Sequence, residues 1–241
     1  MRFTFFDTET TGFDEDDEVV QLAYIDMAGE KLTPFVKEFK PSKPVGFKAM
    51  AIHGLTNEYL ADKPMLSDSI EMVSRFKKRG MTRCVGFAHN ADFDIKMLSR
   101  NGASPEYPVV DTLRCSKHLL EDAEGYSLGV LYYQYGLNRK MDDLASKLKI
   151  DTSCLGAHNA MYDTMMLYLL AMHLLDKVDG HVATLLRLTK QPVKVKEFPF
   201  GKYKGQRISD VASENPGYLQ WMLENISDMS EDLRYTLEQY V

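Results

Sequence analysis

The sequence predicts an α/β fold in which a mixed sheet is flanked by helices and followed by a small C-terminal module. Three β-prone runs lie close together near the start of the chain, at residues 2–6, 19–28 and 31–41, as in an antiparallel meander. Helical and strand-like segments then alternate up to residue 178. Strands followed by such an alternation are typical of a sheet with an antiparallel portion and helices on its faces.

The helices and later strands have recognisable ends in the sequence. Residues 67–80 have helical spacing and stop at a glycine. The apolar run at 83–89 is typical of a buried strand, and Asn90 is then expected to cap a helix at 91–101. The remaining predicted elements are a strand at 107–112 and helices at 127–137, 141–150 and 159–178.

The chain length permits one main core and a small second domain. A chain of 241 residues buries one good core and leaves some length for an appendage. The Lys- and Pro-containing stretch TKQPVKVKEFPF, at 189–200, is the expected boundary. We therefore predict a first domain at 1–188 and a second domain at 189–241.

Cysteine usage and hydropathy indicate a soluble protein of a reducing compartment. The three cysteines are an odd number without CxxC spacing, which argues against a disulfide framework and a cysteine zinc site (Cys84, Cys115 and Cys154). An acid appears by position 7, unlike in a signal peptide. The most apolar run, at 161–175, carries Asp163 and His173 and is too short to span a bilayer. We expect a cytoplasmic protein with no membrane contact.

Charge is unevenly distributed along the chain. The formal net charge is −6, yet seven basic residues and one acid lie between Arg187 and Arg207. A local basic stretch on an acidic chain suits contact with a polyanion, and a solvated linker is the ordinary alternative. The composition leaves both interpretations open.

Two carboxylates, Asp7 and Glu9, follow the first β-prone run in the stretch FFDTETTG. Residues two apart in a strand point to the same face, so these two charges converge. A divalent cation between them would cancel their repulsion, because hard cations prefer oxygen ligands. A solvated turn after the strand is the alternative, and further carboxylates elsewhere would favour the cation.

Further acids occur in the stretches FAHNADFD and AHNAMYD. Asp94 shares a helix face with apolar residues, and Asp163 heads a stripe of leucines at i+4, i+7 and i+11, so both carboxylates are expected to face the core. A buried acid needs a partner. Asp92, in contrast, is explained by the favourable helix dipole near an N-terminus. His158 precedes the helix of Asp163 and, taken alone, is an ordinary loop histidine.

Taken together and in this order, FDTETTG, HNADFD and HNAMYD resemble the three motifs of the DnaQ-like (DEDDh) 3′-to-5′ exonucleases. The resemblance implies a ribonuclease H-like mixed sheet flanked by helices, with a small C-terminal module. It also implies four metal-binding catalytic acids and one catalytic histidine, five residues before the last acid: Asp7, Glu9, Asp94, Asp163 and His158.

The resemblance further implies the chemistry of the site. Two Mg²⁺ ions, for which Mn²⁺ can substitute, would clamp the scissile phosphate, one activating the attacking water and the other stabilising the leaving 3′ oxygen. His158 would accept the proton of that water, since histidine is the side chain that titrates near neutral pH. On this interpretation His158 is not a metal ligand.

The residues around the first motif are expected to hold the terminal nucleotide. Thr10, Thr11 and Gly12 follow the metal acids, where backbone and hydroxyl groups can contact the nucleotide and a glycine permits close approach. Phe13 either stacks on the terminal base or belongs to the core. The stretch AMAIHGLTNEYLADKP resembles the family segment that meets this nucleotide, which implies that His53 contacts the substrate.

The C-terminal stretch FPFGKYKGQRISDVASENPGYLQWMLENI resembles the C-terminal module of exonucleases of the exonuclease X type. Its basic loop offers Lys202, Lys204 and Arg207 as contacts to nucleic-acid phosphates. Its amphipathic helix is expected to carry Trp221 in the apolar face. Packing or dimerisation is the alternative role of this module.

Three functions remain open at the level of the sequence. The resemblance favours a metal-dependent 3′-to-5′ exodeoxyribonuclease that acts on single- or double-stranded DNA with a free 3′ end. An exoribonuclease of the same superfamily is the second, because contacts to the 2′-hydroxyl of RNA come from the surrounding pocket and not from the acids. The third is a nucleic-acid-binding subunit without turnover, which the presence of all the motif residues disfavours.

Overall fold

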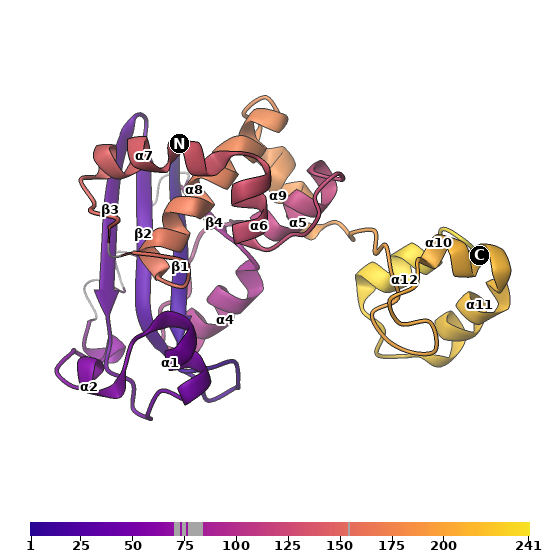
Figure 1. The fold of residues 1–241 in the computed structure, drawn as a ribbon, viewed down its shortest axis with the longest axis horizontal. Helices are drawn as coiled ribbons and strands as arrows, with labels where there is room; N and C mark the ends of the chain where they lie inside the picture. Colours follow the sequence, from indigo (N-terminus) through magenta and orange to yellow (C-terminus); the bar gives the residue numbers. More distant parts are fainter. Residues whose placement is uncertain (70–72, 74–75, 77–83, 154) are drawn as a thin grey trace. The chain divides into compact units, whose positions relative to one another are not determined.

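The computed structural model describes residues 1–69, 73, 76, 84–153 and 155–241, which form two compact units, Met1–Thr189 and Lys190–Val241 (Figure 1). The helix expected at 67–80 falls largely outside the described residues, as does Cys154. Within the part of the chain that is described, no helix is both long and apolar enough to cross a membrane.

A five-stranded mixed sheet forms the centre of the first unit, with the strand order β3-β2-β1-β4-β5. β1 pairs with β2 antiparallel and with β4 parallel, and the outer pairs continue these two patterns. This arrangement confirms the predicted α/β class with an antiparallel portion. The strands are β1 (Arg2–Thr10), β2 (Val19–Ala28), β3 (Lys31–Glu38), β4 (Cys84–Ala88) and β5 (Val109–Asp111).

β1 lies where the antiparallel and parallel parts of the sheet meet, and its alternating residues belong to two separate cores. Phe5 and Phe6 are both fully buried, one in each core. Phe5 stacks on Phe87 of β4, with ring centroids 4.9 Å apart. Because Asp7 and Glu9 follow Phe5 at every second position, they point to the same face of the sheet as Phe5.

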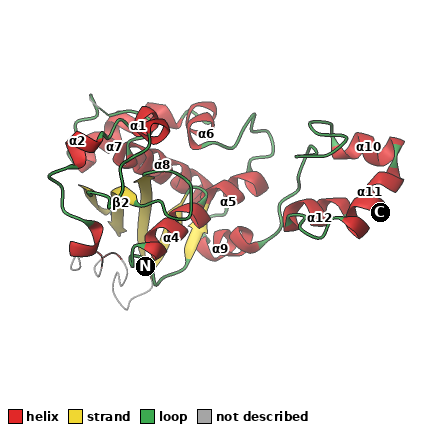
Figure 2. Ribbon diagram, turned by 90° about the horizontal axis from the view of Figure 1, so that it is seen from below, coloured by secondary structure: helices red, strands yellow, loops and turns green. Residues whose placement is uncertain are grey.

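Helices lie on both faces of this sheet (Figure 2). The 18-residue helix α8 (Ala160–Lys177) packs across β1 and β2 on the Phe5 face. Helix α4 (Ala91–Arg100) packs on the Phe6 face. The other described helices of this unit are α1 (Phe47–His53), α2 (Asn57–Leu60), α5 (Thr112–Leu119), α6 (Leu128–Gln134), α7 (Met141–Leu148) and α9 (Val182–Lys190), with the short turns η1 (Leu66–Asp68) and η2 (Leu137–Lys140).

The leucine stripe predicted for α8 is confirmed. Leu167, Leu170 and Leu174 are all buried in the core on the Phe5 face. Their contacts hold α8 against β1 and β2, because burying such side chains stabilises the packing by roughly 1.5–3 kcal/mol each. The first turn of α8, which carries Asp163, is thereby placed beside the end of β1.

Two local features bear on the sequence predictions. β1 extends through Asp7 and Glu9 to Thr10, in agreement with the strand position expected for the two acids, because β2 offers backbone partners along nearly its whole length. Asn90 lies at the N-cap position of α4, as predicted, but it adopts a left-handed conformation with φ 65° and its side chain makes no capping bond. The N–H groups at the start of α4 instead reach the carboxylate of Asp111, at the end of β5.

The second unit has a small core of its own between α10 (Ile208–Glu214), α11 (Pro216–Asn225) and α12 (Glu231–Leu237). The buried side chains of this core are Phe198, Ile208, Val211, Leu219, Met222, Met229, Leu233 and Leu237. Trp221 is 50% exposed, so the prediction that it lies in the buried apolar face of α11 is wrong. The helix buries Leu219 and Met222 instead.

Candidate active site

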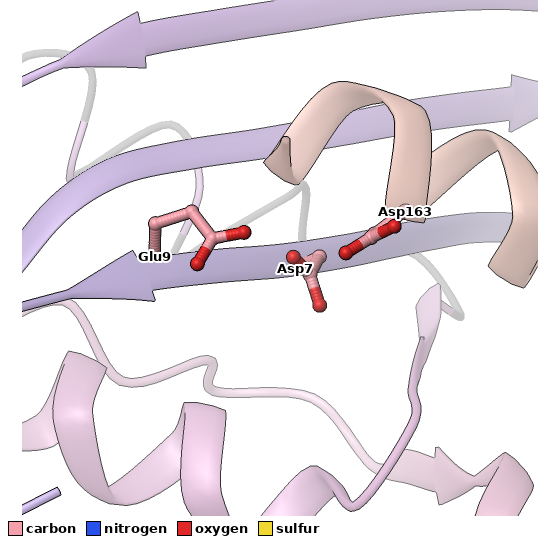
Figure 3. Close-up of side chains that lie close together, drawn as sticks. All are labelled: Asp7, Glu9 and Asp163. Atoms are coloured by element: carbon pink, nitrogen blue, oxygen red, sulfur yellow. The ribbon is translucent and has the colours of Figure 1, made fainter. Parts of the chain in front are cut away.

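β1 and α8 bring three carboxylates together (Figure 3). Asp7 and Glu9 project from β1, and Asp163 projects towards them from the first turn of α8. Each can offer one oxygen to a shared ion, since these oxygen atoms all lie within 4.8 Å of one another. We refer to these three residues as the carboxylate cluster. Oxygen ligands at such spacing suit a hard divalent cation.

The surroundings raise the pKa of every acid in the carboxylate cluster. Burial is the largest cause for all three residues. Repulsion from neighbouring acids adds to it for Asp7 and Glu9, and the pKa of Glu9 rises to about 8. For Asp163, the hydrogen bond and charge of His158 act in the opposite direction. The protein groups alone therefore favour protonation, and a bound cation would restore the ionised carboxylates.

The two oxygens of Asp163 have different surroundings. Oδ2 accepts the backbone N–H of His158 at 3.0 Å. Oδ1 is buried and has no hydrogen-bond partner among the described residues. A buried polar atom without a partner costs roughly 1–3 kcal/mol, and more when it is charged. These donors therefore fit a divalent cation, which would take Oδ1 as a ligand.

Asp94 reaches the same region from the opposite face of the sheet. It is 3% exposed, and its Oδ1 accepts both the backbone N–H and the hydroxyl of Thr8, at 3.0 and 2.7 Å. Burial raises the pKa of Asp94 to about 7, although the bonds from Thr8 lower it. Because Thr8 lies between Asp7 and Glu9, these bonds fix α4 to the segment of β1 that carries the cluster.

Asp111, which the sequence prediction does not include, holds the start of α4. Its carboxylate accepts the N–H groups of Asn90 and Ala91, each at 3.2 Å. It also accepts those of Leu113 and Arg114 in α5, at 2.8 and 3.3 Å. One carboxylate therefore caps two helices that begin after the neighbouring parallel strands β4 and β5. Its sequence signal, an acid that ends a predicted strand, is too common to single it out.

Gln21 anchors α8 in a comparable way and is likewise inconspicuous in the sequence. It lies opposite Glu9 in the pairing of β1 with β2 and is 2% exposed. Its Oε1 accepts the N–H of Ala160 at 2.9 Å, and its Nε2 donates to Glu38 at 3.2 Å. The side chain of Asn159 caps the next N–H groups of the helix. The first turn of α8 is therefore fixed to β2.

His158 is exposed and lies in the left-handed backbone region, with φ 66°. This conformation costs a residue other than glycine roughly 1–3 kcal/mol, and such residues cluster at functional sites. It directs the His158 N–H to Asp163 and leaves the imidazole in solvent. Besides burial, the charge of His158 lowers the pKa of His53.

The predicted nucleotide-binding residues Thr10, Thr11 and Gly12 lie at the end of β1 and in the loop after it, which Asp17 organises. The Thr11 hydroxyl donates to Asp17 at 2.5 Å, and the Thr10 hydroxyl donates to the Gly12 carbonyl at 2.6 Å. A Cβ at Gly12 would lie 2.5 Å from an oxygen of Asp17. Lys43 pairs with Asp17 at 2.8 Å. Glycine at position 12 thus leaves room for the side chain of Asp17. The predicted contact of Gly12 with a nucleotide stays a prediction.

Phe13 is 78% exposed, so the alternative that it belongs to the core is wrong. Its ring centroid lies 5.6 Å from that of Phe93, and the two rings are tilted by 47°. Phe93 directly precedes Asp94 on α4. The chain therefore presents an aromatic ring to solvent near the acids, and its stacking on a base stays a prediction.

His53 is fixed to the same loop. Its Nδ1 accepts the N–H of Leu55 at 3.0 Å, which assigns the proton to Nε2. Nε2 then donates to the carbonyl of Thr10 at 3.2 Å. Burial lowers the pKa of His53, while this hydrogen bond raises it. Both ring nitrogens are engaged within the protein, so His53 positions Thr10, and the contact of His53 with substrate stays a prediction.

The predicted phosphate contacts belong to the second unit. Lys202, Lys204 and Arg207 are exposed, and the Nζ of Lys202 lies 4.9 Å from the centroid of the Tyr203 ring. Within the described ranges, none of the three basic residues forms a salt bridge with an acid. Their charges are available to a ligand.

Two family models match the sequence. A model described as Exonuclease matches residues 4–171. A model described as Exodeoxyribonuclease X-like C-terminal matches residues 198–227. The first match contains the whole carboxylate cluster, and the second contains the basic loop and α11.

Relatives match over much or nearly all of the chain. It is 31% identical over 239 residues to Exodeoxyribonuclease 10 of Escherichia coli (strain K12), which covers 98% of this chain and 96% of the relative. It is 30% identical over 177 residues to DNA polymerase III subunit epsilon of Rickettsia conorii, which covers 69% of this chain and 70% of the relative. Similarity to Exodeoxyribonuclease 10 thus extends through both units.

Solved structures share the fold over about three quarters of the chain. A structure described as exonuclease X in complex with 5′ overhanging duplex DNA matches 78% of this chain and 99% of its own, with a TM-score of 0.57 and 24% identity. Escherichia coli exonuclease I in complex with a dT13 oligonucleotide matches 76% of this chain and 42% of its own, with a TM-score of 0.52 and 20% identity. The predicted ribonuclease H-like fold is confirmed.

Proposed function

The chain belongs to the exonuclease family, and we propose that it is a 3′-to-5′ exodeoxyribonuclease that removes nucleotides from the 3′ ends of DNA. The observation that carries this proposal is the carboxylate cluster, with its buried Asp163 oxygen that lacks a partner among the described residues. DNA is supported as the substrate by the relative named Exodeoxyribonuclease 10 and by solved neighbours in complex with DNA.

Four acids would hold the metal: Asp7, Glu9, Asp94 and Asp163. We assign two Mg²⁺ ions, with Mn²⁺ as a substitute, because Mg²⁺ favours carboxylate ligands that leave room for water and phosphate. When bound, the two ions would activate the attacking water and stabilise the leaving 3′ oxygen. The protein supplies rigidity: β1 carries two acids, and the anchored first turns of α4 and α8 carry the others.

His158 would act as the general base. Its backbone N–H is fixed to Asp163 at 3.0 Å, so the residue cannot drift from the cluster, while its imidazole is open to solvent and to an incoming nucleotide. An imidazole nitrogen would accept the proton of the attacking water and later release it to solvent. The left-handed backbone of His158 is consistent with a strained functional position.

The loop after β1 would receive the terminal nucleotide. Thr10 and Thr11 use their hydroxyls to hold the loop itself, so their backbone groups are the available contacts. Phe13 would stack on the terminal base, since its ring is exposed. His53 would support this pocket through its bond to Thr10.

The two units would have different functions. We assign catalysis to residues 1–188 and a nucleic-acid contact to the exonuclease X-like module at 189–241. Lys202, Lys204 and Arg207 would bind phosphates without reading the base sequence. The absence of any salt bridge to them among the described residues supports this role.

A labelled-substrate assay tests the proposed activity. DNA labelled at its 5′ end should give a ladder of shortened products in Mg²⁺, and DNA labelled at its 3′ end should release labelled mononucleotide at once. Neither should occur in EDTA. RNA of the same sequence is the control for the sugar: faster cleavage of RNA would favour an exoribonuclease, and a ladder from the 3′-labelled strand would reverse the assigned direction.

A further inference from the structure

Three aromatic rings gather in the second unit. Tyr218 and Trp221, one turn apart on α11, stack with ring centroids 5.9 Å apart and an interplanar angle of 22°. Tyr203, from the loop before α10, meets Tyr218 edge to face at 4.8 Å. We refer to Tyr203, Tyr218 and Trp221 as the aromatic platform.

The surrounding chain is shaped to support this platform. Gly201 has φ 82°, and a Cβ there would lie 2.7 Å from the Tyr218 hydroxyl, so glycine leaves the room that this ring needs. Asn215 donates its Nδ2 to the Tyr203 hydroxyl at 3.1 Å. The buried ring of Phe198 lies 5.8 Å from that of Tyr218. The platform is therefore built on the core of the unit and not on a loose loop.

Trp221 is unusually exposed for a large aromatic side chain beside a buried core. It is the single tryptophan of the chain and is 50% exposed, while Leu219 and Met222 beside it are fully buried. Leaving a large aromatic ring in water forgoes the free energy of burying it. The core of the unit is formed by other side chains, and Trp221 is neither among them nor among the partly buried residues packed against them. A single exposed apolar side chain is ordinary, but a patch of adjoining rings, such as Trp221 with the stacked Tyr218, is a feature of interaction surfaces.

Basic side chains adjoin the platform. Lys202 stands over the ring of Tyr203, and Lys204 and Arg207 are exposed in the same loop. In the described part of the chain, none of these three forms a salt bridge. A ligand that complements this surface carries negative charges and flat apolar faces.

We propose that the aromatic platform binds single-stranded DNA, with bases stacked on Trp221 and Tyr218 and phosphates bound by Lys202 and its basic neighbours. A single strand exposes both its base faces and its phosphates, whereas a duplex hides its base faces within the helix. Stacking on aromatic rings tolerates any base, which suits an enzyme that degrades all sequences. The identity of the strand rests on the proposed function, and the contact itself lies outside the carboxylate cluster.

Fluorescence of Trp221 reports on this contact alone, because the chain has no other tryptophan. In EDTA, which prevents cleavage, adding a short oligothymidylate to the full-length protein should quench this fluorescence saturably. An abasic oligonucleotide of the same length keeps the phosphates and lacks the bases. It should bind at least about 5-fold more weakly, since even one stacked base contributes roughly that factor.

Substitutions sharpen the test. Trp221→Ala should weaken binding of a labelled oligothymidylate, measured by anisotropy, by about 5- to 150-fold, and Trp221→Phe should restore most of the affinity. The matched control is Tyr235→Ala, since Tyr235 is 37% exposed on α12 and lies outside the platform. It should leave affinity unchanged. Circular dichroism would verify that each variant is folded.

Equal affinity for the thymidylate and abasic strands would overturn the proposal, as would binding that leaves the fluorescence of Trp221 unchanged. A dimeric mass by light scattering that Trp221→Ala reduces to a monomeric one would also overturn it, since the platform would then be an interface between two copies. Failure to cleave DNA in Mg²⁺ would instead contradict the proposed function, and it would not alter the titration in EDTA.

Discussion

The first unit places its carboxylates on a buried strand and at helix starts, whereas the second unit places aromatic rings and lysines at its surface. In the first, Asp94 is 3% exposed and bonded twice to β1. In the second, Trp221 is 50% exposed and Lys202 stands beside Tyr203. Both arrangements forgo stability in the free protein, since one crowds negative charges and the other leaves apolar rings in water.

This difference separates chemistry from substrate binding. Cations that act on a phosphate must be held within fractions of an ångström, so their ligands are fixed by a sheet and by capped helices. A flexible strand of DNA needs accessible rings and charges but no such rigidity. The comparison implies that substitutions in the first unit lower the rate of cleavage, while substitutions in the second unit weaken binding.

Removing a metal ligand should have the largest effect. Asp7→Asn and Asp163→Asn each take one carboxylate from the cluster, and we expect cleavage in Mg²⁺ to fall by at least about 10³-fold. Asp92→Asn is the matched control, because Asp92 is an exposed acid on α4. It should change the rate less than about twofold. Near-normal turnover by either of these two variants would show that catalysis does not depend on the carboxylate cluster.

Removing the general base should have the next largest effect. His158→Ala should lower the rate by about 10²- to 10⁴-fold, because the attacking water would lose its proton acceptor. The backbone N–H that binds Asp163 remains, so the affinity for Mn²⁺ should change little. Calorimetry with Mn²⁺ would check this, and a variant that no longer binds Mn²⁺ would make His158 a ligand.

Removing Asp111, which caps both α4 and α5, should have an intermediate effect on the rate of cleavage. Asp111→Ala leaves the N–H groups of Asn90 and Ala91 without their partner and loosens the start of α4. We expect a drop in rate of about 10- to 100-fold, as for other residues that support metal ligands. Ser230→Ala, which removes the cap of α12, is the control and should cost about 1 kcal/mol of stability.

The comparison of Asp111→Ala with Ser230→Ala distinguishes an effect on the rate of cleavage from an effect on stability. If Asp111 only stabilises the fold, both variants will have similar rates once they are compared well below their melting temperatures. If it positions Asp94, the concentration of Mg²⁺ that gives half the maximal rate will rise for Asp111→Ala and stay constant for Ser230→Ala.

Neutralising the basic loop should have the smallest effect. Alanine at Lys202, Lys204 and Arg207 should weaken DNA binding and make it less dependent on salt. The slope of log affinity against log salt should fall by about 0.7 for each phosphate of a single strand that the protein no longer neutralises, or about 2 in total. Measurement in EDTA at several salt concentrations would check this, and an unaltered slope would remove the second unit from phosphate binding.

The carboxylate cluster is predictable from the sequence because its signals are local. Asp7 and Glu9 share a face through the two-residue period of a strand. Asp163 is oriented by the leucine stripe of its own helix. Each inference needs only residues within one element, and the resemblance to a family then joins the elements.

The supporting residues are not predictable in this way because their partners lie far along the chain. Gln21 binds the N–H of Ala160, which is 139 residues away. Asp111 caps a helix that begins 20 residues earlier. Trp221 shows the same limit, since helical spacing alone does not decide whether it or Met222 enters the core.

Thermal unfolding with and without Mg²⁺ shows whether the carboxylate cluster is a divalent-cation site. Burial and neighbouring acids raise the pKa of Glu9 to about 8 in the folded chain. Protonated Glu9 is therefore favoured in the folded state. This contribution to stability is fully present below the ordinary pKa of Glu9 and is lost as the pH rises towards 8. Mg²⁺ should offset this loss by favouring the ionised acids.

We predict that Mg²⁺ at about ten times its dissociation constant raises the melting temperature by about 3 to 6 °C at pH 8, and by less at pH 6. Asp7→Asn, with one acid fewer, should melt higher than the unsubstituted chain in EDTA at pH 8 and gain little from Mg²⁺. An equal gain from Mg²⁺ in both proteins, or no gain in either, would contradict the assignment of the cluster as a cation site.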